Sequence, residues 1–293
     1  MVYKKTIGEK AFDIFNVLFL ILASIVFLYP LWFVIISSVS SATAIASGDV
    51  TWLPKGINFS AYERVFSDSK VWVAYKNTFI YVGVGTVINL VLTTLGAYPL
   101  SRRDLRGRNF IMMFIVFTMF FSGGLIPEYL NVRDLGLYDS RWAIWLPSAI
   151  SAYNLIVMRT FFQSTIPDGL IESAKIEGAN EYRILWSIII PLSMPVIAVM
   201  TLFYAVGHWN SWFSAMIYLQ DRSLHPLQLL LREILVASQT NDMMGGVSSG
   251  DVVAVSETIK YATTVIATLP ILVIYPFLQK YFAKGVMIGG VKE

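Results

Sequence analysis

Four residues whose side chains could do chemistry lie in or beside long apolar stretches of the chain. They are Asn154, Tyr204, Trp209 and Asn210. Amide and hydroxyl groups hydrogen-bond to the hydroxyls of a sugar, and aromatic rings stack on the apolar face of a sugar ring. The same groups can instead satisfy neighbouring helices, or anchor the chain at a membrane surface in the case of the tryptophan. The sequence leaves both interpretations open.

A second pattern of functional interest occupies residues 163–183. Pro167 is typical of the first turn of a helix, and Gly178 is typical of the residue just beyond a last turn. The residues between them predict an apolar face made of Leu170, Ile171, Ala174 and Ile176. Such a helix is too short to span a bilayer. It is suited to docking into a groove on a partner protein.

A third candidate is the glycine-rich tip of a long segment, residues 208–260. It contains Gly245, Gly246 and Ser248. Glycines permit a close approach of backbone to a bound partner. A plain mobile loop accounts for the same composition, and the sequence does not choose between the two.

The elements that position these residues are predicted to be membrane helices. Of the 293 residues, 56% are hydrophobic and only 14% are charged, against about 25% charged in soluble domains. A membrane helix needs about 20 mostly apolar residues. The apolar stretches predict an all-α integral membrane protein with a single domain of six spans, at about 13–38, 77–100, 109–127, 142–162, 184–207 and 261–282.

The distribution of basic residues predicts the orientation of these spans. Basic residues gather on the cytoplasmic side of membrane proteins. The turn at 102–108 holds Arg102, Arg103, Arg106 and Arg108. This turn and residues 163–183 are therefore expected in the cytoplasm, together with both termini, and residues 208–260 form an outer loop.

Several classes of function find no support in the sequence. The chain has no cysteine and only two histidines, so a metal centre is not expected. The predicted spans hold charged residues only near their ends, Asp13, Arg159 and Lys280, and none at their centres, which argues against an ion-coupled carrier. No G-x-x-x-x-G-K-[ST] phosphate loop occurs, so any ATP-driven step requires another polypeptide.

The segment 166–195 resembles the Glu-Ala-Ala loop of ABC importer permeases. Glu172-Ser173-Ala174 matches the core of that loop, Gly178 its glycine and Pro191 its distal proline. Ser173 stands for alanine and Glu177 for the more usual aspartate. The resemblance extends to 99–102, 118–127, 209–213 and the tail 280–292, which are similar to the second permease of maltose-type carbohydrate importers, in the subgroup serving complex oligosaccharides.

This resemblance implies a type I importer permease, multi-pass in the bacterial cytoplasmic membrane, that is not itself an enzyme. It implies three kinds of protein partner: a second, non-identical permease, two ATP-binding subunits that carry ATP and magnesium, and an extracytoplasmic solute-binding protein. No cofactor is expected in this chain, and no nucleic acid partner. The coupling contact would be made by Glu172, Ser173, Ala174, Glu177, Gly178 and Ala179.

The resemblance also gives a role to the glycine-rich tip around Gly245, which would enter the binding protein and help to displace the sugar. Two other classes of function remain. A passive facilitator working alone would also lack intramembrane charge, and the short helix would then be a surface helix. A membrane-embedded enzyme is less well supported, because no carboxylate pair or nucleophile–histidine pair occurs at membrane depth.

Overall fold

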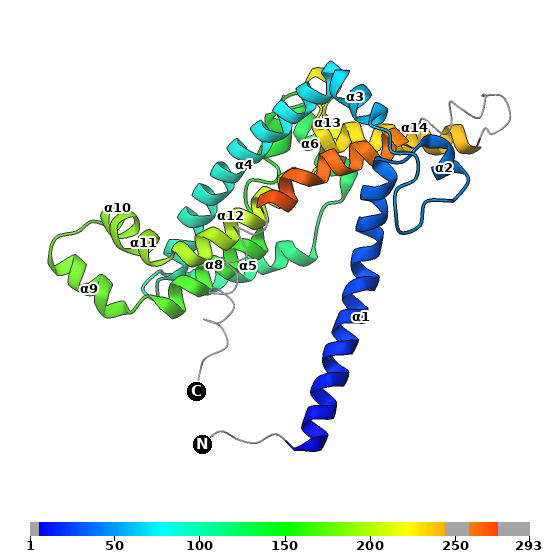
Figure 1. Ribbon diagram of the computed structural model, residues 1–293. Coiled ribbons are helices and arrows are strands. Elements are labelled where there is room, and N and C mark those ends of the chain that lie inside the picture. Colours follow the sequence, from blue (N-terminus) through cyan, green and yellow to red (C-terminus); the bar gives the residue numbers. More distant parts are fainter. Residues whose placement is uncertain (1–5, 244–257, 275–293) are drawn as a thin grey trace. The chain divides into compact units, whose positions relative to one another are not determined.

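The computed structural model describes residues 6–243 and 258–274 (Figure 1). All regular elements within these residues are helices, as predicted. The chain divides into two compact units, Met1–Asp68 with Glu233–Thr268 and Ser69–Arg232 with Leu269–Glu293. Each unit is described by itself.

The first unit begins with a long apolar helix, α1 (Ile7–Ser38). Its first turn is closed by a capping box, in which Thr6 Oγ1 accepts from the Glu9 backbone N–H and Glu9 Oε2 accepts from the Thr6 backbone N–H. The short helices α2 (Ala42–Ala46) and α3 (Ser60–Ser67) follow. The indole N–H of Trp32 donates to the Trp52 carbonyl at 2.9 Å and thereby ties this segment back to α1.

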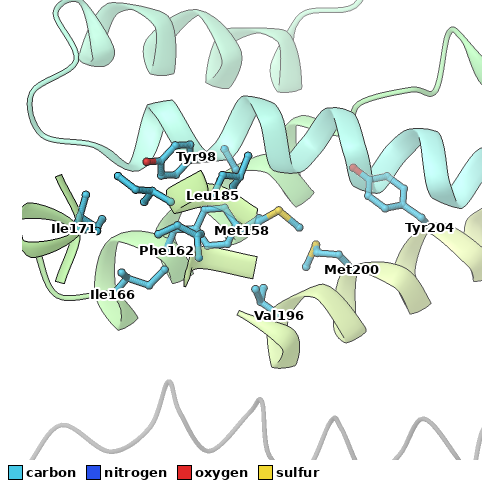
Figure 2. Close-up of a cluster of buried hydrophobic side chains, with 13 residues drawn as sticks. Tyr98, Met158, Phe162, Ile166, Ile171, Leu185, Val196, Met200 and Tyr204 are labelled. Carbon is cyan, nitrogen blue, oxygen red and sulfur yellow. The ribbon is translucent and has the colours of Figure 1, made fainter. Parts of the chain in front are cut away.

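The second unit is built around α4 (Ser69–Ser101), which packs against α8 (Ala152–Thr165) and α12 (Met194–Trp209) (Figure 1). One cluster of buried side chains fills the space between these helices and continues beneath a short helix, α9 (Asp168–Ile176) (Figure 2). The cluster joins thirteen buried residues: Ala97, Tyr98, Met158, Phe162, Ile166, Ile171, Ala174, Ile184, Leu185, Ile189, Val196, Met200 and Tyr204.

Several of the apolar stretches fold as broken helices. The helices α5 (Arg108–Phe120) and α6 (Leu125–Asp134) meet at 113°. The segment Glu181–Leu192 meets α12 at 83° after a π-helical turn, η1 (Leu185–Ile189). Pro191 and Pro195 flank this bend, and each removes a backbone donor from the helical ladder. Glu181–Leu192 comprises α10 (Glu181–Ile184), η1 and α11 (Ile190–Leu192).

The stretch 142–162 is also interrupted. It forms α7 (Trp142–Trp145), a non-helical segment at 146–151 that contains Pro147, and then α8. Within the described residues, α1 and α4 can cross a membrane by length and composition, and the number rises to four if each bent pair is one span. The shorter apolar helix Thr258–Ile274 lies in the last predicted span. Six spans and the cytoplasmic location of the termini remain predictions.

Past α12 the chain forms α13 (Phe213–Tyr218), a 3-10 turn η2 (Arg222–Leu224) and α14 (Leu227–Met243). The beginning of α4 holds the turn in place. The Asn77 side-chain amide donates to the Ser223 and His225 carbonyls at 2.6 and 3.1 Å, and the Tyr81 hydroxyl donates to the Leu224 carbonyl. These bonds satisfy the carbonyls of an irregular segment.

The contact between α4 and α12 requires a glycine, which gives a first prediction. A Cβ at Gly85 would lie 2.5 Å from His208 Nε2, whereas a Cβ at Gly83 would meet nothing within 4 Å. We expect Gly85→Ala to cost about 1–3 kcal/mol through overpacking. Gly83→Ala should be neutral or stabilising by up to about 1 kcal/mol. Thermal unfolding of the solubilised protein measures both, and equal melting temperatures for the two variants would contradict the close contact.

Candidate functional site

The first candidate site surrounds the interrupted segment 146–151. The side-chain amide of Asn89, on α4, donates to the Ser148 and Ala149 carbonyls at 2.6 and 2.9 Å. The hydroxyl of Tyr204, on α12, accepts from the Ser151 backbone N–H at 3.3 Å. Unsatisfied backbone groups are costly away from water, so these two side chains make the break tolerable in apolar surroundings.

Both side chains are themselves fixed by further hydrogen bonds. The Tyr204 hydroxyl lies 2.7 Å from Thr93 Oγ1 on α4, and Asn89 Oδ1 lies 2.6 Å from His208 Nε2. Because Asn89 uses its amide hydrogens on two carbonyls, its Oδ1 is an acceptor and His208 must donate from Nε2. These bonds join α4, the break and α12 into one rigid arrangement.

A pocket of about 330 Å³ opens beside this arrangement. Its lining comes from both sides of the break and from the end of α12 and the segment after it: Ile144, Ser148, Ser151, Asn154, Phe203, Tyr204, Gly207, His208, Ser211 and Ser214. No Asp, Glu, Lys or Arg occurs among these described lining residues. The pocket is polar but uncharged.

The structure brings together two of the residues singled out in the sequence. Asn154 and Tyr204 both line the pocket, and each is only 7% exposed. They differ in how they are engaged. The Tyr204 hydroxyl is used within the fold, whereas the Asn154 side-chain amide has no hydrogen bond to any described residue. Its polar atoms are directed to a space that can hold a solute.

The other two residues of the first group lie outside the pocket. Trp209 is 4% exposed, and its ring meets that of Phe79 edge-on with 5.7 Å between centroids, so it packs in the core. Asn210 is exposed beyond the end of α12. Gly245, Gly246 and Ser248 lie outside the described residues. The polar lining residues that sequence reasoning missed are Ser148, Ser151 and Ser214, because a serine by itself gives no signal of a pocket.

The second candidate site is α9. Pro167 precedes its first residue, and Gly178 ends it with φ of +81°. The backbone N–H of Gly178 donates to the Lys175 carbonyl, and that of Ala179 donates to the Ala174 carbonyl at 2.9 Å. This is a Schellman end, in which a left-handed residue satisfies the last carbonyls of the helix. The predicted start and end of the short helix are thus observed.

The predicted apolar face of α9 divides into two parts. Ile171 and Ala174 are buried in the cluster shown in Figure 2, whereas Leu170 and Ile176 are 41% and 88% exposed. Glu172, Ser173, Glu177 and Gly178 are exposed as well, and Ala179 is half-buried. The helix is therefore attached to the body of the unit through one side, and the other side presents acidic and apolar groups.

Ion pairs connect α9 to the end of α4 and the turn after it. Arg102 and Arg103 lie 3.5 and 3.7 Å from the Asp168 carboxylate at the start of α9. Near the other end, Lys175 Nζ lies 2.7 Å from Glu181 Oε1. Lys175 and a hydrogen bond from the Tyr98 hydroxyl hold the pKa of Glu181 below its ordinary value. Since these groups are partly exposed, the pairs orient the helix more than they stabilise it.

Comparison with known proteins agrees with this fold. The chain belongs to the family described as "Binding-protein-dependent transport system inner membrane component", which matches residues 2–288. It is therefore a permease component of a transport system, a class in which ATP is hydrolysed by separate subunits. The resemblance to importer permeases found in the sequence is confirmed.

Individual relatives match along nearly their whole length. Two from Bacillus subtilis are each 42% identical over 287 residues: the "Polygalacturonan/rhamnogalacturonan transport system permease protein YtcP", covering 97% of this chain and 99% of the relative, and "Protein LplC", covering 98% and 97%. A chain in the crystal structure of a bacterial ABC transporter involved in import of the acidic polysaccharide alginate is 36% identical, with a TM-score of 0.85, covering 96% of this chain and all of that one.

The hydrogen bonds at the break give a second prediction. Replacing Tyr204 by Phe leaves the Ser151 N–H and the fully buried Thr93 hydroxyl without this partner. We expect a loss of about 1–3 kcal/mol in the free energy of unfolding. The exposed Tyr153→Phe serves as the control and should change stability by less than about 0.5 kcal/mol. Indistinguishable unfolding curves for the two variants would show that the break is held by other contacts.

Proposed function

We propose that the chain is one permease subunit of a binding-protein-dependent ABC importer for an oligosaccharide. The observation that carries the proposal is the full-length match, at 42% and 36% identity, to permeases of carbohydrate transporters. The uncharged pocket supports it, since hydroxyl and amide groups suit a polyhydroxylated solute. With a second, non-identical permease the chain would enclose the translocation path.

The membrane arrangement belongs to the same proposal. Six spans would cross the bacterial cytoplasmic membrane, with both termini in the cytoplasm. The bent pairs α5–α6 and Glu181–Trp209 would each serve as one span. The basic turn at 102–108 is tied by ion pairs to α9, so the positive-inside rule that assigns the turn to the cytoplasm also assigns α9.

The exposed side of α9 would dock on an ATP-binding subunit. Glu172, Ser173, Glu177 and Gly178 would make the contact, Ala179 would border it, and the buried Ala174 would fix the helix from beneath. Two ATP-binding subunits, carrying ATP and magnesium, would close on nucleotide binding and move α9. Such coupling requires contacts that differ between two states, which a rigid helix with one free side can supply.

A solute-binding protein on the outer side would deliver the sugar. In this proposal the chain itself binds no cofactor and performs no covalent chemistry. A facilitator working alone would share the pocket but would have no need for the exposed side of α9. The two functions are therefore separated by variants of α9.

The third prediction tests this coupling role. Gly178→Asp and Glu172→Lys should leave the assembled complex intact and reduce ATP hydrolysis stimulated by the binding protein by tenfold or more. At Gly178 the cause is strain at positive φ together with an altered docking side, and at Glu172 it is reversal of an exposed charge. The measurement is the ATPase rate of the co-expressed complex in lipid, with and without binding protein and sugar.

A matched control is available at the end of α6. Gly136 also follows a helix end, has φ of +69° and has open space at its Cβ position, but lies outside 163–183. Gly136→Asp introduces the same charge and comparable backbone strain, and it should retain stimulated hydrolysis. If no ATPase co-purifies with the chain, or if the α9 variants transport normally, the facilitator function replaces the proposed one.

A further inference from the structure

The pocket beside the helix break contains one buried polar side chain that the fold does not use. Asn154 is 7% exposed and lines the pocket, and no hydrogen bond joins its side-chain amide to a described residue. The amide atoms are not among the fully enclosed polar atoms without a partner, so the amide keeps access to the pocket. Its neighbours at the break, Asn89 and Tyr204, are engaged in holding backbone groups, so of these three side chains the Asn154 amide is the one left for a ligand.

Other lining residues of the pocket have a chemistry that matches the Asn154 amide. Ser211 and Ser214 contribute hydroxyls that make no hydrogen bond to a described side chain or backbone group. Hydroxyl and amide groups together suit a sugar, whose hydroxyls both donate and accept.

The absence of charged side chains among the described lining residues limits which chemical groups of a ligand the pocket can recognise. The described lining residues include no Lys or Arg to pair with a carboxylate and no Asp or Glu to repel one. The pocket also contains the imidazole of His208, but its Nε2 is already hydrogen-bonded to Asn89. A site built to recognise a sugar carboxylate would be expected to contain a cationic partner, because a desolvated carboxylate is costly without one.

We propose that this chain holds a sugar subsite, centred on the Asn154 amide, that recognises the hydroxyls of one sugar unit and is indifferent to carboxylates elsewhere on the oligosaccharide. The inference rests on the proposed import function and adds to it the part of the solute that this subunit contacts. If the solute is acidic, its carboxylates would then be recognised by another component of the transporter. The relatives named for polygalacturonan and alginate make this division testable.

The experiment compares two probes with the assembled transporter and its binding protein in proteoliposomes. One probe is a short oligogalacturonide, and the other is the same oligomer with its carboxylates reduced to alcohols. Asn154→Leu keeps the side-chain size and removes the hydrogen bonds. We expect it to raise the half-saturating concentration for uptake about tenfold, and by the same factor for both probes. Asn131→Ala, at an exposed position on α6, is the control and should match the wild type.

A second variant separates hydrogen bonding from packing. Asn154→Gln keeps an uncharged amide with its donor and acceptor, so uptake of the neutral probe should be impaired less than by Asn154→Leu. Wild-type kinetics for Asn154→Leu with both probes, or a loss confined to the acidic probe, would overturn the subsite. Absence of sugar-stimulated ATP hydrolysis by the wild-type complex would instead contradict the import function on which the subsite rests.

Discussion

The second unit depends on one constraint: the backbone groups left unpaired at a break in a helix need other hydrogen-bond partners. Pro147 cannot continue the ladder begun in α7, and the segment 146–151 leaves carbonyls and N–H groups without intrahelical partners. In apolar surroundings each such group costs several kcal/mol unless it is satisfied. Asn89 and Tyr204 satisfy them from two different helices, so α4 and α12 are fixed to the break and thereby to each other.

A continuous cluster of packed side chains connects the pocket to α9. Tyr204 lies at one end of the buried cluster and Ile171, from α9, at the other (Figure 2). Closely packed interiors transmit displacements rather than absorb them. A movement of α9 would therefore act on Met158 and Met200, between the two ends, and on the hydroxyl that holds the break. The cluster offers a physical route by which a partner at α9 could change the shape of the pocket.

Sequence patterns correctly predicted those features of the structure that depend on composition or on a few neighbouring residues. The all-helical class follows from hydropathy, and both ends of α9 follow from Pro167 and Gly178, because these signals are local. The family was indicated by the resemblance to the Glu-Ala-Ala loop. The interruptions within the predicted spans were not predicted. A window over 142–162 averages hydropathy and does not register that Pro147 interrupts the helix, so two helices appear where one stretch was expected. The bend before α12 escaped notice for the same reason.

The side chains around the pocket show why the rest could not be predicted. Asn89, Asn154 and Tyr204 have the same sequence signature, a polar group in an apolar run. The first and last of them hold backbone groups, whereas the Asn154 amide has no partner among the described residues. Which role each takes depends on partners more than fifty residues away, such as Ser148 for Asn89. Sequence position cannot separate an amide that satisfies the fold from one that is left for a solute. Only the hydrogen-bond partners separate them, and they single out Asn154 because the fold has already satisfied its neighbours.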